Sequence, residues 1–162
     1  MNNSLLIIDV QKGFINEHTE HLPKKIEKLQ ERYDNIYAVQ FVNLNNSLFR
    51  SLLHWDKFNL NSDDTKAAFQ LKPNVKVYQK YSYGIPHCIL EDLNNDDVNS
   101  IDICGISTDA CILKTAMDLF DEKIVPRILV DYCACYHGKE KHRQALKFLE
   151  SLIGSENIVK VK

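Results

Sequence analysis

The chain has 162 residues, of which 44% are hydrophobic and 26% charged, so it carries enough apolar material for the core of one globular domain. Its formal net charge of -2 and its isoelectric point near 6.3 leave no broad basic surface for a nucleic acid or an anionic membrane. No repeat or low-complexity linker divides the sequence, and we expect a single domain over residues 1–162.

The N-terminus and the cysteines favour a cytoplasmic protein. The opening stretch MNNSLLIIDVQKGF has no basic segment before its short apolar run and reaches a charge at Asp9, which does not fit a signal peptide or a membrane anchor. The five cysteines are an odd number in a chain large enough to fold without disulfides, so we expect free thiols.

Predicted strands and helices alternate along the chain. Short apolar runs, several of them β-branched, predict strands at residues 5–8, 36–42, 75–78, 101–103 and 124–130. Apolar residues at helical spacing predict helices at residues 22–33, 88–93, 108–120 and 139–152. Continuous apolar strands in this order are typical of a parallel sheet that is buried on both faces. We therefore expect a three-layer, doubly wound, Rossmann-like α/β fold.

Three reactive side chains follow three of the predicted strands. Asp9 ends the first strand, Lys80 follows the third, and Cys111 lies in the helix after the fourth. Each of these residue types is often only structural, and cysteine is among the types most often simply buried. Because ligands of open parallel sheets bind beyond the carboxyl ends of the strands, we expect the three side chains to meet at one site.

A carboxylate, an ammonium and a thiol together favour acyl transfer. With Ser107 or Thr108 as the N-cap, Cys111 takes about the third or fourth helical position, where unpaired amides favour a thiolate. Lys80 adds positive charge, so we expect Cys111 alone among the five thiols to have a strongly lowered pKa. Asp9 can take the thiol proton and return it to a departing nitrogen, and the helix-end amides can receive an oxyanion.

Three segments, LLIIDVQKGF, KYSYG and GISTDACILKTAMDLF, resemble in order the signature segments of the isochorismatase-like cysteine hydrolase superfamily. The resemblance covers nearly the whole chain. It implies that Cys111 is the nucleophile, that Asp9 is the general acid and base, and that Lys80 lowers the thiol pKa or stabilises the transition state. It also implies a cis peptide between Ile106 and Ser107 beside an oxyanion hole that includes the backbone of Cys111, and it favours a homo-oligomer.

The metal site of the nicotinamidases in this superfamily has no counterpart in the sequence. Those enzymes carry an Asp-x-His element after the second strand, whereas this chain reads FVNLNNSLFRSLLHWDKF, in which His54 stands alone. The CACYH stretch at residues 133–137 does not match structural zinc spacing either. We expect no metal and no other cofactor, with a weak metal site near His54 left open.

Four aromatic residues near the predicted site, Phe14, Trp55, Tyr81 and Tyr83, are candidates to wall a pocket for a flat or apolar acyl group. Phe14 and Tyr83 also match aromatic positions of the superfamily. The expected substrate is a small molecule whose carbon-nitrogen bond is hydrolysed: an amide, a ureide or a carbamoyl compound. Alternatives are an isochorismatase-type vinyl ether hydrolase, a nicotinamidase and, in other classes, a thiol redox sensor or a non-catalytic binding module.

Overall fold

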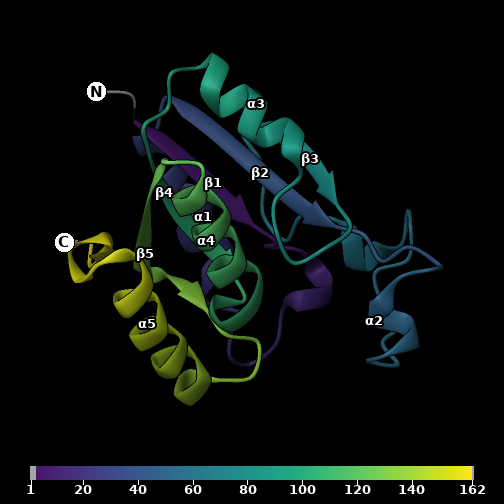
Figure 1. Ribbon diagram of the computed structural model, residues 1–162. Coiled ribbons are helices and arrows are strands. Elements are labelled where there is room, and N and C mark those ends of the chain that lie inside the picture. Colours follow the sequence, from purple (N-terminus) through teal and green to yellow (C-terminus); the bar gives the residue numbers. More distant parts are fainter. Residues whose placement is uncertain (1–2, 162) are drawn as a thin grey trace.

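A computed structural model describes residues 3–161 and contains a six-stranded, entirely parallel sheet (Figure 1). The strand order is β3-β2-β1-β4-β5-β6. The strands are β1 Ser4–Ile8, β2 Asn35–Phe41, β3 Lys76–Lys80, β4 Ser100–Ile106, β5 Val125–Ala134 and β6 Ile158–Val159. The helices are α1 Leu22–Leu29, α2 Leu48–Ser51, α3 His87–Asn95, α4 Leu113–Asp121 and α5 Lys139–Ile153.

Both faces of the central strands β1, β2 and β4 are buried, which confirms the predicted three-layer architecture. Along β1, Leu6 and Ile8 join a core cluster that includes residues of α3, α4 and α5. Leu5 and Ile7 point to the opposite cluster, which contains the buried residues of α1. This alternation places one helical layer on each side of the strands, because successive side chains of a strand point to opposite faces.

The structure differs from the sequence prediction at several element ends. Strand β6 and the short helix α2 were not predicted, and β5 continues to Ala134 opposite a register shift between Ile103 and Gly105 of β4. The predicted helix 108–120 begins as a π-helical turn, Thr108–Ile112, before α4. The predicted helix 22–33 ends as an α-helix at Leu29 and continues as a short 3-10 turn. No helix within residues 3–161 is long and apolar enough to cross a membrane.

The strand order creates one switch point, between β1 and β4, at which the chain changes its direction of travel across the sheet. There the two strand ends approach closely, because a Cβ on Gly105 would lie 2.0 Å from the carbonyl oxygen of Ile8. Gly105 also has a φ of +129°, a conformation that glycine adopts readily. The residues after β1 and β4 are thus held side by side.

Helix α2 and its flanking loops lie apart from the helical layers, beyond the carboxyl ends of β2 and β3 (Figure 1). Buried Asn43 anchors this segment, since its side-chain amide donates to the carbonyl oxygens of Trp55 and Lys57 at 2.8 and 3.1 Å. The segment therefore overhangs the same edge of the sheet as the switch point.

Candidate active site

The structure brings Asp9, Lys80 and Cys111 together at the carboxyl edge of the sheet, where the sequence placed them. Asp9 directly follows β1, Lys80 is the last residue of β3, and Cys111 lies in the π-helical turn after β4. The Lys80 ammonium nitrogen is 2.8 Å from Asp9 Oδ2, and the two side chains are 1% and 0% exposed. Lys80 also donates to the carbonyl oxygen of Tyr83 at 3.0 Å, which fixes the direction of the ammonium group.

Burial and mutual charge set the protonation of this pair. Burial raises the pKa of Asp9, although the neighbouring Lys80 acts in the opposite direction. Burial alone would lower the pKa of Lys80, but the charges of Asp9 and Cys111 outweigh it, and the pKa of Lys80 is raised. The arrangement therefore keeps the ammonium form of Lys80 beside a carboxylate that binds a proton more readily than an exposed aspartate does.

The predicted lowering of the Cys111 thiol pKa is wrong for the free protein. Burial and the negative charge of Asp9 raise the pKa of Cys111 to about 12, and they outweigh Lys80, which acts to lower it. The helix-end amides that suggested a thiolate do not offset this desolvation. The thiol is thus protonated at neutral pH, and it becomes a nucleophile only if a neighbouring base takes its proton.

The loop between β4 and Cys111 matches the prediction in its geometry. The Ile106–Ser107 peptide bond is cis, Ser107 occupies the N-cap position, and Cys111 is the fourth residue of the turn. The carbonyl oxygen of Ser107 accepts from the amides of Ala110 and Ile112 at 3.1 Å each, which closes the turn around the thiol. The oxyanion hole at Ile106, Ser107 and Cys111 remains a prediction.

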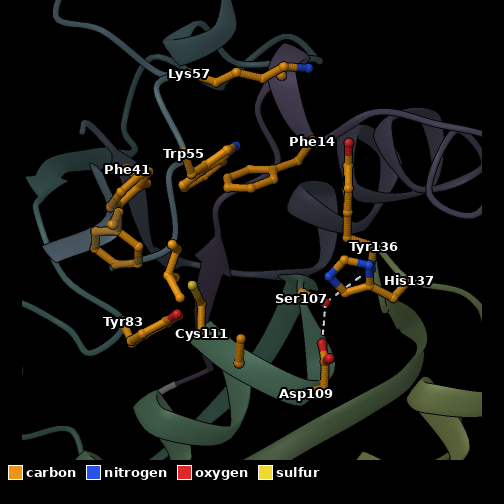
Figure 2. A pocket seen from close by; sticks show the side chains of 14 residues that line it. Phe14, Phe41, Trp55, Lys57, Tyr83, Ser107, Asp109, Cys111, Tyr136 and His137 are labelled. Carbon is orange, nitrogen blue, oxygen red and sulfur yellow. Dashed lines mark hydrogen bonds between the residues drawn. The ribbon is translucent and has the colours of Figure 1, made fainter. Parts of the chain in front are cut away.

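A cavity of about 410 Å³ opens above the thiol. Figure 2 shows Phe41, Trp55 and Phe14 on one side of it and Ser107, Asp109 and His137 on the other. The predicted Phe14, Trp55 and Tyr83 all line the cavity, whereas Tyr81 does not. Three further aromatic residues line it that sequence reasoning did not single out: Phe41, Phe49 and Tyr136.

The aromatic side chains contact one another and form a continuous wall. Trp55 stacks on Phe41 with ring centroids 5.6 Å apart, and Phe49 meets Tyr83 edge-on at 4.9 Å. Phe14 lies 6.0 Å from Trp55 and 6.2 Å from Tyr136. These contacts connect residues from four separate parts of the chain, so the wall exists only in the folded protein.

Gln11 is a further residue near the site that the sequence analysis did not single out. It is fully buried, accepts from the amide of Phe41 at 2.8 Å and donates to the carbonyl oxygens of Phe41 and Thr65 at 2.9 Å each. These bonds satisfy the backbone at the end of β2 and fix Phe41 in the cavity wall. The uncommon combination of a glutamine beside a buried strand end was the available signal.

Polar side chains contact the loop that carries Cys111 from the side of β5 and α5. Asp109 Oδ1 accepts from Ser107 Oγ and, at 3.0 Å, from Cys135 Sγ. Burial acts to raise the pKa of Asp109, but these hydrogen bonds outweigh it and hold the pKa below its usual range. Thr108 Oγ1 lies 2.8 Å from His142 Nδ1, and this hydrogen bond ties α5 to the loop.

Metal-ligating side chains do not gather at this site. Within residues 3–161, no group of three or more His, Cys, Asp or Glu side chains is placed to hold a metal ion, and His54 has no such companions. All five cysteines are free thiols; Cys133 and Cys135 donate to different acceptors, the Ile103 carbonyl and Asp109.

Solved structures with the same architecture include several hydrolases. An isochorismatase-like hydrolase from Alkaliphilus metalliredigens superposes with a TM-score of 0.83 at 16% identity, covering 94% of this chain and 92% of the other. The nicotinamidase of Bacillus subtilis gives 0.83 at 19% identity over 95% and 97% of the two chains. N-carbamoylsarcosine amidase of Thermoplasma acidophilum gives 0.79 at 14% identity over 95% and 94%. At sequence identities this low, these superpositions show a shared fold alone.

Sequence comparison identifies the family. Isochorismatase domain-containing protein 2 is 33% identical over 60 residues in Bos taurus and 36% identical over 63 residues in Xenopus laevis. The matched segment covers 36% and 38% of this chain but only 29% and 31% of the relatives' lengths. The isochorismatase domain family, in contrast, matches residues 3–156. The chain therefore belongs to the isochorismatase family.

Proposed function

We propose that this protein hydrolyses a carbon-nitrogen bond in a small amide, ureide or carbamoyl compound through a thioester on Cys111. The observation that carries the proposal is the fully buried Asp9–Lys80 ion pair beside Cys111, which among residues 3–161 is the only thiol that lines the cavity. A buried charged pair is costly to maintain, and its position next to a nucleophile at a cavity floor favours a catalytic role.

Acylation begins with a proton transfer that the pKa values make necessary. Since the Cys111 thiol has a pKa of about 12, the Asp9 carboxylate must take its proton as Sγ attacks the substrate carbonyl carbon. The carbonyl oxygen becomes an oxyanion, which backbone amides beside Ser107 and Cys111 stabilise. The carbon-nitrogen bond then breaks, Asp9 returns the proton to the leaving nitrogen, and a thioester and a free amine or ammonia result.

Deacylation repeats these roles with water. Asp9 removes a proton from a water molecule, and the oxygen of that water attacks the thioester carbonyl carbon. The carbon-sulfur bond breaks, the Cys111 sulfur recovers the proton from Asp9, and the carboxylic or carbamic acid leaves. Lys80 remains an ammonium ion throughout, held by Asp9 and Tyr83, and its charge stabilises the negative charge that develops near the sulfur.

This division of labour favours a carbon-nitrogen bond over a vinyl ether. Cleavage of a vinyl ether by protonation has less need of a nucleophile, yet here a thiol lies between the ion pair and the cavity. Among the solved structures of this fold are proteins named as a nicotinamidase and as N-carbamoylsarcosine amidase, so both compound types belong in a substrate screen.

A screen for ammonia release from small amides, ureides and carbamoyl compounds tests the proposal. For an active substrate, Cys111→Ala and Asp9→Asn should each lower kcat at least about a thousandfold, and their effects should not add. Cys88→Ser is the matched control, because it removes an exposed thiol and should leave kcat unchanged. Intact-mass spectrometry on a slow substrate should detect an acyl adduct on the wild type and none on Cys111→Ala.

One result would refute thioester formation on Cys111. A Cys111→Ala variant that keeps more than about a tenth of wild-type turnover, which is a change of less than about 1.4 kcal/mol in the barrier, would exclude a covalent role for this thiol. The vinyl ether reaction would then be the better proposal.

A further inference from the structure

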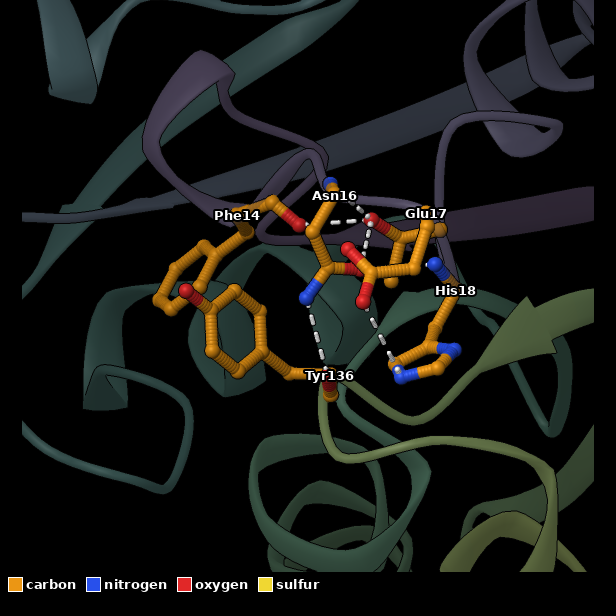
Figure 3. A network of polar contacts seen from close by, with 6 residues as sticks. Phe14, Asn16, Glu17, His18 and Tyr136 are labelled. Carbon is orange, nitrogen blue, oxygen red and sulfur yellow. Dashed lines mark hydrogen bonds and ion pairs between the residues drawn. The ribbon is translucent and has the colours of Figure 1, made fainter.

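Two loops that contribute to the cavity wall are joined by a side chain outside the catalytic triad. The loop after β1 carries Phe14, and the loop after β5 carries Tyr136. Figure 3 shows Asn16, two residues beyond Phe14, reaching from the first loop to the backbone of the second. The Asn16 side-chain amide nitrogen donates to the Tyr136 carbonyl oxygen at 2.9 Å.

The backbone of Tyr136 is held on both sides by side chains. Its carbonyl oxygen accepts from Asn16, and its amide donates at 3.0 Å to Ser107 Oγ, in the loop that carries Cys111. Tyr136 is thereby tied both to the first loop and to the catalytic loop. With both backbone polar groups fixed in this way, Tyr136 has little freedom to move its backbone, and the point from which its ring extends into the cavity wall is set.

The rest of Asn16 is also fixed. Its side-chain Oδ1 accepts from the backbone amide of His18 at 2.9 Å. Its backbone amide donates to the hydroxyl of buried Thr19, also at 2.9 Å. Thr19 in turn donates to the carbonyl oxygen of Phe14 at 2.7 Å. The same short segment therefore sets Phe14 through Thr19 and Tyr136 through Asn16.

The two rings meet at the cavity. Phe14 and Tyr136 lie 6.2 Å apart at an interplanar angle of 78°, an edge-to-face contact, and both line the cavity that holds Cys111. Their separation depends on the Asn16 bridge because each ring belongs to a different loop. A shift of the second loop would change the separation of the two rings, and none of the three proposed catalytic residues belongs to that loop.

We propose that Tyr136 is a specificity-determining residue whose ring receives the flat, non-reacting part of the substrate, and that Asn16 is the positioning residue that sets this ring. The inference rests on the proposed function, since it assigns roles within the same site. Binding energy from the non-reacting part of a substrate is what such a wall supplies.

The chain supplies its own reporter for a binding test. Trp55 is the only tryptophan, lines the cavity and stacks on Phe41. Titration of the protein with benzamide, followed by Trp55 fluorescence, measures the binding of a ring that carries a carboxamide. Acetamide, measured by competition with benzamide, serves as the probe that lacks the ring.

Four substitutions separate the contribution of the Asn16 bridge from that of the Tyr136 ring. Asn16→Asp keeps the acceptor for His18 but replaces the donor to Tyr136 with an oxygen, and Asn16→Ser is a shorter second variant that also lacks this donor. Tyr136→Phe keeps the ring, whereas Tyr136→Ala removes it. Asn74→Asp is the matched control, because Asn74 is exposed and donates to the Asp34 backbone.

Loss of the ring or of the bridge should weaken benzamide binding by about three- to tenfold. Tyr136→Phe and Asn74→Asp should stay within about twofold of the wild type, and acetamide affinity should be unchanged in every variant. In the Asn16→Asp, Tyr136→Ala double variant, the loss should equal that of Tyr136→Ala alone, because Asn16 acts through Tyr136.

Three results would overturn the inference. They are a wild type without a saturable response to benzamide, both Asn16 variants binding benzamide within twofold of the wild type, and additive losses in the double variant. Because fluorescence needs no turnover, these results are independent of the proposed hydrolysis. Failure of the ammonia screen would leave a positive binding pattern intact, and an active hydrolase with an unaffected Asn16 variant would refute only this inference.

Discussion

Replacement of Lys80 by methionine should leave the buried Asp9 carboxylate without its positively charged partner. The variant keeps the length of the side chain and removes the ammonium group 2.8 Å from Asp9, which is 0% exposed. Removal of one partner from a buried pair costs about 3–5 kcal/mol. For a chain of this size each kcal/mol corresponds to about 2–4 °C in melting temperature, so the midpoint should fall by roughly 6–20 °C. Catalysis should be lost as well.

The loss of stability should depend on pH in a direction that the structure fixes. Burial raises the pKa of Asp9, and without Lys80 only hydrogen bonds from Cys111 and from the Phe41 backbone act against it, so the folded-state pKa lies above the unfolded value of about 3.9. A group of this kind destabilises the fold progressively as the pH rises from the unfolded pKa through the folded pKa. Lys80→Met should therefore lose less stability at pH 5 than at pH 8.

Urea denaturation at the two pH values measures both effects. An Asp9→Asn, Lys80→Met double variant should regain most of the lost free energy of unfolding, because neither charge is left unpaired, and it should remain inactive. A Lys80→Met protein as stable as the wild type at pH 8, or a double variant as unstable as the single one, would refute the description of this pair as a coupled buried charge system.

Four further results are expected. Because burial raises the pKa of Asp9 above 3.8, kcat/KM should fall as the pH drops through a value above 3.8, and an acid limb at or below 3.8 would exclude Asp9 as the base. Alkylation of Cys111 by iodoacetamide in the free protein should keep rising up to pH 10, since its pKa is about 12; a plateau near pH 7 would restore the sequence prediction. Gly105→Ala should lower kcat by about tenfold or more, because its Cβ would meet the backbone carbonyl of Ile8 and push apart the two strand ends that carry Asp9 and Cys111; kcat within twofold of the wild type would contradict this coupling. Elemental analysis should find no stoichiometric divalent metal, and chelators should leave activity unchanged, since the sequence lacks the Asp-x-His element.

The sequence predicted the architecture and the meeting of Asp9, Lys80 and Cys111 at one edge of the sheet, because both depend on local patterns. Apolar runs marked five of the strands, and the strand ends pointed to Asp9, Lys80 and Cys111. Strand β6 was missed because two residues give no periodicity, and α2 because a helix of four residues carries too few turns to show one.

Other features of the site depend on contacts between distant segments. Tyr136 and Phe49 enter the cavity wall because separate loops fold back beside Phe14 and Tyr83, which no local pattern reports. The Cys111 pKa was predicted in the wrong direction because the position of a residue in a helical turn is visible in a sequence, whereas the depth of its burial is not.

Strand β3 lies at an edge of the sheet, and Lys80 is its only fully buried residue. An edge strand has a neighbour on one side only, so it is the part of a sheet that separates most readily. Here the ammonium group of that strand is fastened to the carboxylate that follows a central strand. The ion pair therefore links the edge strand to the centre of the sheet, and separation of β3 from β2 would take Lys80 away from Asp9.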